Sequence, residues 1–176
     1  MWLAHRSSDK RTLLEQLSYI RQLEAQFPIA PLRVVYTKAG NTLVAAVVPD
    51  GRSIIDHKLY WAPVASLAEG RYLCAVLNAP CFTEVIRPYQ STGAFGPRDF
   101  DKYVWLPKTP LFNPASDLHA RLAALAGEAE TVATSVAPAA KGGFQGHRRD
   151  VRSALAAAGI SKQLDEAVVE LLSLTR

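Results

Sequence analysis

The stretch LRVVYTKAGNTLVAAVVPDG, residues 32–51, decides the fold class of this sequence. Val, Leu and Tyr dominate two short runs, which are bounded by Ala39-Gly40-Asn41 and by Pro49-Asp50-Gly51. Runs of β-branched and aromatic residues between such turn residues are typical of strands joined by hairpins. A third run of the same kind, residues 53–64, follows directly. We therefore expect a three-stranded antiparallel meander.

Helical patterns surround these strands. Upstream, an apolar stripe predicts a helix from residue 9 to about residue 25, formed by Leu13, Leu14, Leu17, Ile20 and Leu23. Downstream, Ser66 and Glu69 have capping-box spacing, and Pro80 ends or kinks the helix that follows them. Another helix is expected to begin at Asn113 or Ser116, and two more to meet at Ala158-Gly159.

The fold class that follows is α+β, with a small, mainly antiparallel sheet, helices packed on it and a helical C-terminal tail. YVWL, residues 103–106, is a candidate short strand, with Tyr103 and Trp105 expected in the core. The segment 138–147 is a candidate flexible break. We thus expect a recognition-like domain over 1–137, and a tail over 148–176 that packs on it.

The composition is that of one globular domain. The chain has 176 residues, 49% of them apolar, which is sufficient for a core. Its formal charge of +4 and isoelectric point near 9.2 are compatible with a polyanionic partner. No apolar run approaches the roughly 20 residues of a membrane helix. Charges also interrupt the first residues, where a signal peptide has its apolar core. We expect a cytoplasmic protein with no membrane partner.

The residue patterns of common active sites are missing. No glycine-rich loop has phosphate-binding spacing, and the four histidines are scattered. Cys74 and Cys81 lie seven apart, which suits neither a zinc pair nor a disulfide within a helix, so we expect two reduced, buried thiols. The sequence therefore predicts no catalytic residue, no metal and no cofactor.

Two segments with acidic residues have ordinary explanations. Asp56 and His57 fall in a predicted strand, where neighbouring side chains face opposite ways, so a catalytic dyad is not expected. Asp99 and Asp101 point the same way if their segment is extended, but a carboxylate pair needs a basic or metal partner to act. Ion pairs with the adjacent Arg98 or Lys102 account for these two aspartates. A small enzyme built on these four side chains is the least favoured hypothesis.

The order of features is more informative than any single motif. It resembles the C-terminal region of large adenine-N6 DNA methyltransferases of restriction–modification and phage-defence systems. The residues that carry the resemblance are YLCAVLNAP (72–80), Gly93, GPRD (96–99), Lys102-Tyr103, LPKTP (106–110), FNP (112–114), Leu118-His119 through Ala129-Glu130, and the upstream segments 13–28, 33–40 and 54–61. The resemblance covers most of the chain. It implies a target-recognition region that acts on double-stranded DNA beside a methyltransferase catalytic domain or subunit.

The chain departs from that family in the parts that carry catalysis. It has neither the S-adenosylmethionine-binding motif nor the Asn-Pro-Pro-Tyr motif. Asn113-Pro114 is followed by Ala115-Ser116, which offers no aromatic ring to a flipped base. Ala79 stands where the family has serine, and Lys108-Thr109 where it has an apolar residue. The resemblance therefore implies a non-catalytic fragment or subunit.

The DNA-recognition hypothesis selects two groups of residues. Phosphate contacts need cations, base edges need short polar side chains, and glycines permit a close backbone approach. The loop before residue 110 and the basic cluster beyond the 138–147 break supply these types. The predicted contacts are Arg87, Gln90, Ser91, Thr92, Gly93, Gly96, Arg98, Lys102, Lys108, Lys141, Arg148, Arg149 and Arg152.

Each group also has a structural interpretation. The loop is equally explained as the lead-in to a strand, with turns at its two glycines and Arg98 paired to Asp101. For the basic cluster, a solvated helix start is the favoured interpretation, and Asn78 is expected to cap the helical piece that begins at Pro80. The alternative function is a structural or protein-interaction module, which docks on a methyltransferase or another chain without contacting DNA.

Overall fold

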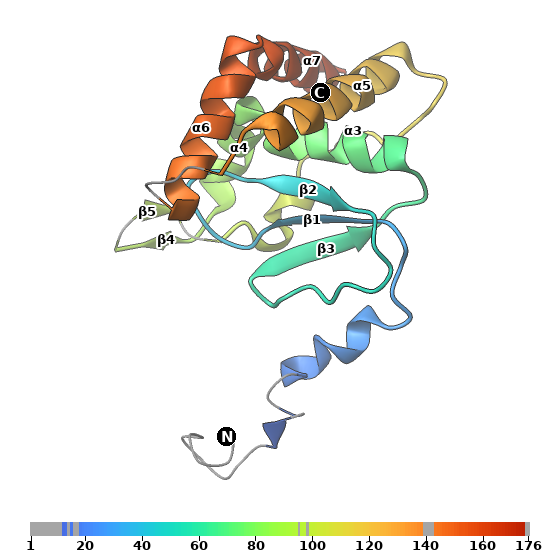
Figure 1. Ribbon diagram of the computed structural model, residues 1–176, viewed down its shortest axis with the longest axis vertical. Helices are drawn as coiled ribbons and strands as arrows, with labels where there is room; N and C mark the ends of the chain where they lie inside the picture. The colour runs from blue at the N-terminus through green and yellow to red at the C-terminus, as the bar shows by residue number, and fades with distance from the viewer. Residues whose placement is uncertain are drawn as a thin grey trace.

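The computed structural model shows a small antiparallel sheet with helices gathered on one side of it (Figure 1). It describes residues 12, 13, 15, 18–94, 96, 97, 99–138 and 143–174. The α+β class expected from the sequence is confirmed. In the described part of the chain, no helix has both the length and the apolar character needed to cross a bilayer.

The sheet is antiparallel, but it is not a meander. Its strands are β1 (Arg33–Thr37), β2 (Ala45–Val48) and β3 (Leu59–Pro63), in the spatial order β2-β1-β3. β1 is central because it pairs with β2 on one edge and with β3 on the other. Four of its successive residues, 33 to 36, are buried, so both of its faces are covered. The long connection 49–58 then carries the chain past β1, so that β3 pairs with β1 and not with β2.

Two buried polar side chains hold that connection in place. Arg33 is fully buried, and its Nη2 donates to the carbonyl oxygens of Asp50 and Ser53 at 3.0 and 2.6 Å. Gln26 donates from Nε2 to the Ile55 carbonyl at 2.9 Å and accepts from the Ile55 N–H at 2.8 Å. Because these bonds engage backbone groups, they satisfy polar atoms that the connection would otherwise bury unpaired.

The first helical layer packs directly on the sheet. α3 (Leu67–Asn78) begins at Ser66, whose Oγ accepts from the Glu69 N–H at 3.1 Å, as the capping pattern predicts. Tyr72 and Val76 on this helix are buried together with Val34 and Tyr36 of β1. Pro80 starts a separate helix, α4 (Pro80–Ile86), so the expected break at that proline is confirmed.

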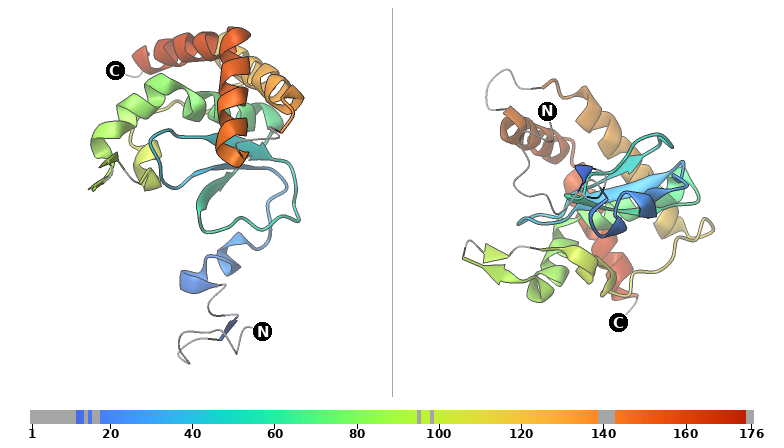
Figure 2. Two further views of the ribbon diagram at one scale, coloured as in Figure 1. Left: turned by 60° about the vertical axis from the view of Figure 1, so that its left-hand side comes forward. Right: turned by 90° about the horizontal axis from the view of Figure 1, so that it is seen from below.

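A second helical layer covers α3 (Figure 2). It consists of α5 (Asp117–Ser135) and α7 (Ile160–Ser173), and α6 (Gly143–Ala157) packs on these two helices. Ser116 caps α5, and Gly159, at φ 73°, makes the left-handed turn between α6 and α7. Ion pairs tie Arg71 of α3 to Glu130 of α5, and Arg121 of α5 to Glu170 of α7.

The C-terminal helix shares the main core. Leu164, Val168 and Leu171 of α7 are buried in the same cluster as Phe82 of α4. Asp165 adds a polar link, because its Oδ1 accepts from the Cys81 N–H at 2.7 Å. Ala79, the N-cap residue of α4, has no side-chain acceptor, so the carboxylate of Asp165 takes that role from a distant part of the chain.

The helix expected over residues 9–25 does not continue through residues 18–26, although Leu13 and Glu15 are helical. Residues 19–26 instead form two 3-10 turns, η1 (Tyr19–Arg21) and η2 (Glu24–Gln26), and Ile20 and Arg21 have positive φ values of 50° and 60°. Of the described residues of the apolar stripe, Leu13 and Ile20 are 45% and 71% exposed, so neither has a surface to bury itself against. Without that packing, helical periodicity alone does not sustain a helix. The start of the expected helix lies outside the described residues.

Two further expectations are corrected downstream. YVWL is not a strand but part of a 3-10 helix, η4 (Asp101–Trp105). Phe100 and Val104, four residues apart, are both fully buried, which is helical spacing, whereas Trp105 is 47% exposed and not in the core. The break expected over 138–147 is wrong for residues 143–147, because they belong to α6; residues 139–142 lie outside the described part.

Asn78 does not cap α4, contrary to expectation. Its Oδ1 accepts from the Ala45 N–H at 3.0 Å, and its Nδ2 donates to the Ala45 carbonyl at 2.9 Å. The side-chain amide thereby pairs with the outer edge of β2 as a neighbouring strand would. The cause is positional, since the C-terminus of α3 ends against that edge.

Candidate nucleic-acid interface

The segment from α4 to α5 carries the first group of predicted contacts. After α4 come η3 (Arg87–Tyr89) and a two-stranded hairpin of β4 (Thr92–Gly93) and β5 (Gly96–Pro97). In this hairpin Thr92 opposes Pro97 and Gly93 opposes Gly96. The two glycines therefore face each other across the hairpin, and the loop is not the lead-in to a longer strand.

The polar residues before the hairpin have mixed exposure. The guanidinium of Arg87 forms a bidentate ion pair with Glu84, at 2.6 and 2.9 Å. That pair raises the pKa of Arg87 and lowers the pKa of Glu84. Gln90 is 6% exposed and donates from Nε2 to the Gly40 carbonyl at 3.4 Å, so it faces inward. Gln90, one of the predicted DNA contacts, therefore does not lie on the solvent-facing surface.

The side chains around the hairpin base face solvent. Ser91 and Thr92 are exposed, and the Ser91 hydroxyl donates to Asp99 at 3.0 Å. Lys102 and Lys108 are also exposed, and neither makes an ion pair with any described residue. These two ammonium groups are therefore available to an external anion.

The second group of predicted contacts lies on the first half of α6. The Arg148 guanidinium lies 5.5 Å from the centroid of the Phe144 ring, which is itself 71% exposed. Arg149 approaches Asp150 at 3.7 Å, a long and exposed contact that contributes little. Arg152 is exposed and has no ion pair within the described residues. An exposed aromatic ring stacked with arginine suits the sugar and base surfaces of nucleic acid as well as its phosphates.

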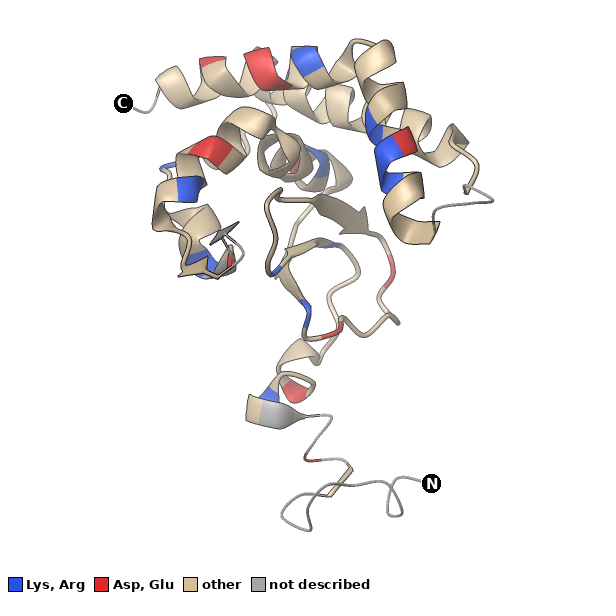
Figure 3. Ribbon diagram, turned by 90° about the vertical axis from the view of Figure 1, so that its left-hand side faces the viewer, with Lys and Arg blue, Asp and Glu red and all other residues tan. Residues whose placement is uncertain are grey.

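The two groups lie at the same end of the molecule. Figure 3 shows Lys and Arg positions along α6 on one side, and along the segment from α4 to η4 on the other, with the sheet and its β1–β2 connection between them. We call these the α6 arm (residues 144–152) and the hairpin arm (residues 87–108). Arg98 and Lys141 of the predicted set lie outside the described residues, and for Gly96 only the backbone is described.

Other chemical groups are placed in structural roles or at the surface. Asp56 and His57 were expected on a strand, but they lie in the turn before β3. There they form an exposed pair at 3.4 Å. A backbone hydrogen bond from Lys58 lowers the pKa of Asp56. Within the described ranges, no three His, Cys, Asp or Glu residues gather as metal ligands would.

The two cysteines are free, as expected. Cys74 is buried, whereas Cys81 is only half-buried and donates weakly from Sγ to the Asp165 carbonyl. Desolvation raises the pKa of each thiol to about 12. Both thiols therefore stay protonated and unreactive at neutral pH.

One histidine is built into the core. His119 of α5 is 7% exposed and lies 4.6 Å from the Tyr72 ring, centroid to centroid. Its Nδ1 accepts from the Asn113 N–H at 3.0 Å, which requires an unprotonated Nδ1. Burial lowers the pKa of this imidazole. Two hydrogen bonds fix the segment that leads from the hairpin arm to α5: the one from the Asn113 N–H to His119, and one from the Tyr72 hydroxyl to the Pro110 carbonyl at 2.8 Å.

Comparison with known proteins gives no match: no family model, no curated protein and no solved structure is similar to this chain. The site must therefore be judged by its own geometry.

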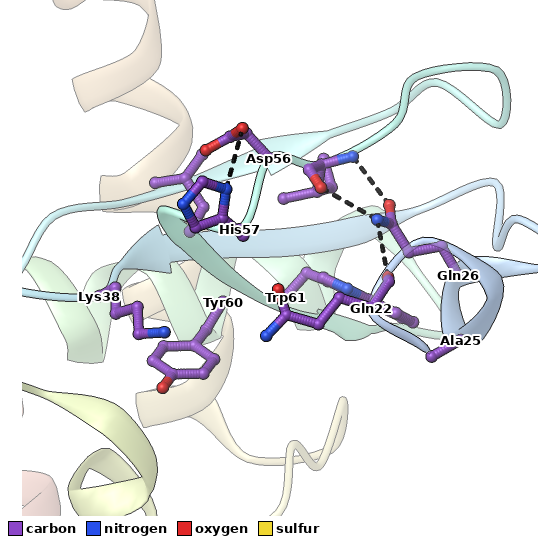
Figure 4. Close-up of a pocket in the computed structure, with 10 residues that line it drawn as sticks. Gln22, Ala25, Gln26, Lys38, Asp56, His57, Tyr60 and Trp61 are labelled. Carbon is purple, nitrogen blue, oxygen red and sulfur yellow. Dashed lines mark hydrogen bonds and ion pairs between the residues drawn. The ribbon is translucent and has the colours of Figure 1, made fainter. Parts of the chain in front are cut away.

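A second feature, which the sequence did not indicate, is a half-open surface pocket of about 180 Å³ at the outer edge of β3. Segments distant in sequence bring its walls together: the η1–η2 region, the end of β1, the turn at residues 55–57 and β3 itself (Figure 4). No sequence signal linked Lys38 to Tyr60, because only the pairing of β1 with β3 brings them together.

Proposed function

We propose that this chain is a non-catalytic DNA-binding region that acts in the cytoplasm and holds duplex DNA between the α6 arm and the hairpin arm. The observation that carries the proposal is the pair of cationic arms at one end of the molecule. Lys102, Lys108 and Arg152 face solvent there without ion-pair partners among the described residues. Unpaired surface cations release counterions when they bind phosphate, which supplies most of the non-specific affinity for DNA.

The hairpin arm supports a specificity role within that proposal. The exposed Ser91 and Thr92 supply hydroxyls for base edges, and facing glycines at residues 93 and 96 leave the tip without side-chain bulk. This part of the chain also carries the resemblance to the C-terminal region of adenine-N6 DNA methyltransferases. A methyltransferase catalytic domain or subunit is accordingly the proposed partner.

Charge reversal on each arm tests the proposal. The variants are Lys102→Glu/Lys108→Glu and Arg149→Glu/Arg152→Glu, and the charge-matched control is Arg52→Glu/Lys162→Glu, which changes two exposed cations elsewhere. If each lost contact costs about 1 kcal/mol, either arm variant weakens duplex binding roughly 30-fold. The control is expected to bind within about threefold of wild type. Equal loss in all three variants would show that only net charge matters and would reject the two arms.

A protein-interaction module is the second candidate, and one observation favours it. Trp105, Leu106 and Leu111 follow one another closely and are 47%, 52% and 91% exposed. Exposed apolar groups in one segment are typical of protein contact surfaces. Light scattering with and without duplex separates the candidates. Self-association that ignores DNA would support the module, whereas a monomer that forms a complex with duplex would support the DNA-binding region.

A further inference from the structure

The apolar side of α6 begins in solvent, before the helix reaches its packing partners. Phe144 is followed on the same side by Arg148, Val151 and Leu155, at spacings of four, seven and eleven residues. Val151 and Leu155 are half-buried, and α6 packs on α5 and α7. Phe144, in contrast, is 71% exposed. Its ring therefore continues the apolar side of α6 into a part of the helix where it is not buried.

Arg148 fixes the orientation of this ring. The Arg148 guanidinium lies 5.5 Å from the centroid of the Phe144 ring, one helical turn away. Contact between a guanidinium and an aromatic face is favourable, and it restricts the rotamers of both side chains. Most of the ring still faces solvent. Phe144 is thus an apolar group held in place before a partner binds, which lowers the entropic cost of inserting it into that partner.

The surroundings of the ring are cationic. Arg149 and Arg152 are exposed on the same arm, and Asp150 is the one acidic residue of the α6 arm. The buried core of a protein contact is depleted of charged residues, so a protein partner would have to desolvate these guanidinium groups. In DNA, each stacked base step is flanked by phosphates. Charge complementarity therefore favours nucleic acid as the occupant of this surface.

The position of the ring agrees with that occupant. In Figure 3 the first turn of α6 is its lower end, and the arginines follow directly above it, across the β1–β2 connection from the hairpin arm. A duplex held between the two arms therefore lies beside this turn. The apolar segment of Trp105 and Leu106 differs, because there one exposed apolar residue follows another.

We propose that Phe144 is a wedge, which enters a base step of the duplex held by the two arms, partly unstacks it and bends the DNA. Arg148, Arg149 and Arg152 contact the phosphates beside that step. Apolar side chains accompanied by arginine bind the minor groove in this way and kink the duplex. The inference rests on the proposed DNA-binding function and deepens it.

The wedge also defines the class of duplex that binds best. Opening a base step costs least at flexible pyrimidine–purine steps such as TA. The preferred substrate is therefore a duplex with an easily deformed step, which the protein recognises without a hydrogen bond to its bases.

The test compares two duplexes that differ only in a central step, TA in one and AT in the other. Dyes at both ends report bending by energy transfer, and 2-aminopurine in place of the central adenine reports unstacking by fluorescence. Wild type is expected to bend the TA duplex, to raise its 2-aminopurine fluorescence and to bind it at least threefold more tightly than the AT duplex.

Substitutions at Phe144 separate insertion from phosphate contact. Phe144→Ala should abolish bending and the preference for TA and weaken binding about fivefold, because base–aromatic contact is lost. Its salt dependence should stay that of wild type, because no phosphate contact is removed. Phe144→Leu keeps an apolar wedge and should retain the bend. The control Leu174→Ala removes a side chain of similar exposure, 73%, and should behave as wild type. Circular dichroism checks the fold of each variant.

The outcomes separate the wedge from the arms. If wild type binds both duplexes without bending or unstacking either, the wedge is overturned and the arms stand. If neither duplex binds, the proposed function falls as well. Bending that survives in Phe144→Ala would overturn the inference, and so would a reduced salt dependence in that variant, since the ring would then act by shaping α6. Loss of self-association in Phe144→Ala, with DNA binding unchanged, would assign the ring to a protein contact instead.

Discussion

Removal of the Asp165 carboxylate tests how the C-terminal helix is held. Asp165→Ala leaves the Cys81 N–H at the start of α4 without its acceptor, 2.7 Å away in wild type. Loss of an N-terminal helix cap costs about 1 kcal/mol, and loss of a negative charge at that end costs about 0.3–1 kcal/mol more. We expect the free energy of unfolding to fall by roughly 1–2 kcal/mol. Asp165→Asn keeps an oxygen acceptor and is expected to lose about half as much.

Urea denaturation measures this directly. With a slope of about 2 kcal/mol per molar urea, the midpoint should fall by roughly 0.5–1 M in Asp165→Ala. Glu166→Ala is the matched control, because the Glu166 carboxylate is exposed and, among the described residues, pairs with Lys162 alone, at 3.7 Å. The midpoint of this variant should stay close to wild type. If Asp165→Ala and Glu166→Ala have the same midpoint, the carboxylate does not cap α4 and the reasoning fails.

Three further outcomes are expected. Asn78→Ala removes the side-chain groups that bond to the Ala45 N–H and to the Ala45 carbonyl. The Ala45 amide hydrogen should then exchange with solvent at least tenfold faster, and the free energy of unfolding should fall by about 1–2 kcal/mol. Unchanged exchange would contradict the pairing of Asn78 with β2. Burial lowers the pKa of His119 below its ordinary 6.5, so the unfolded chain binds the extra proton and the free energy of unfolding should fall as pH drops below about 6.5. Unfolding of wild type and of His119→Asn at pH 5 and 7.5 measures this effect. An identical pH dependence in the two proteins would refute it. Because the pKa of each thiol is about 12, Cys74 and Cys81 should react with a disulfide reagent at pH 8 only after unfolding; rapid reaction of the native protein would show otherwise.

Local sequence signals predicted the elements that depend on neighbouring residues. Ser66 and Ser116 mark two helix starts, Pro80 a break and Gly159 a helix junction, and each acts within one or two turns. The order of the strands was not predictable in this way. β1 is central because the connection 49–58 brings β3 to its second edge, and Arg33 and Gln26 hold that connection from positions far earlier in the chain.

The same distinction applies to the candidate site. The sequence identified the two cationic groups, because clustered Lys and Arg are visible as composition. It did not show that Gln90 faces inward or that Arg87 is held by Glu84, since both facts arise from packing. The surface pocket at β3 was also invisible, because strand pairing and the η1–η2 region assemble it from four separate segments.

The salt dependence of duplex binding tests the central claim most directly. Lys102, Lys108, Arg149 and Arg152 account for about four phosphate contacts, so the logarithm of the association constant should fall with the logarithm of salt concentration at a slope near −3.6. Lys102→Gln and Arg152→Gln should each reduce that slope by about one. A slope near zero, or one that neither substitution changes, would contradict DNA binding by these two arms.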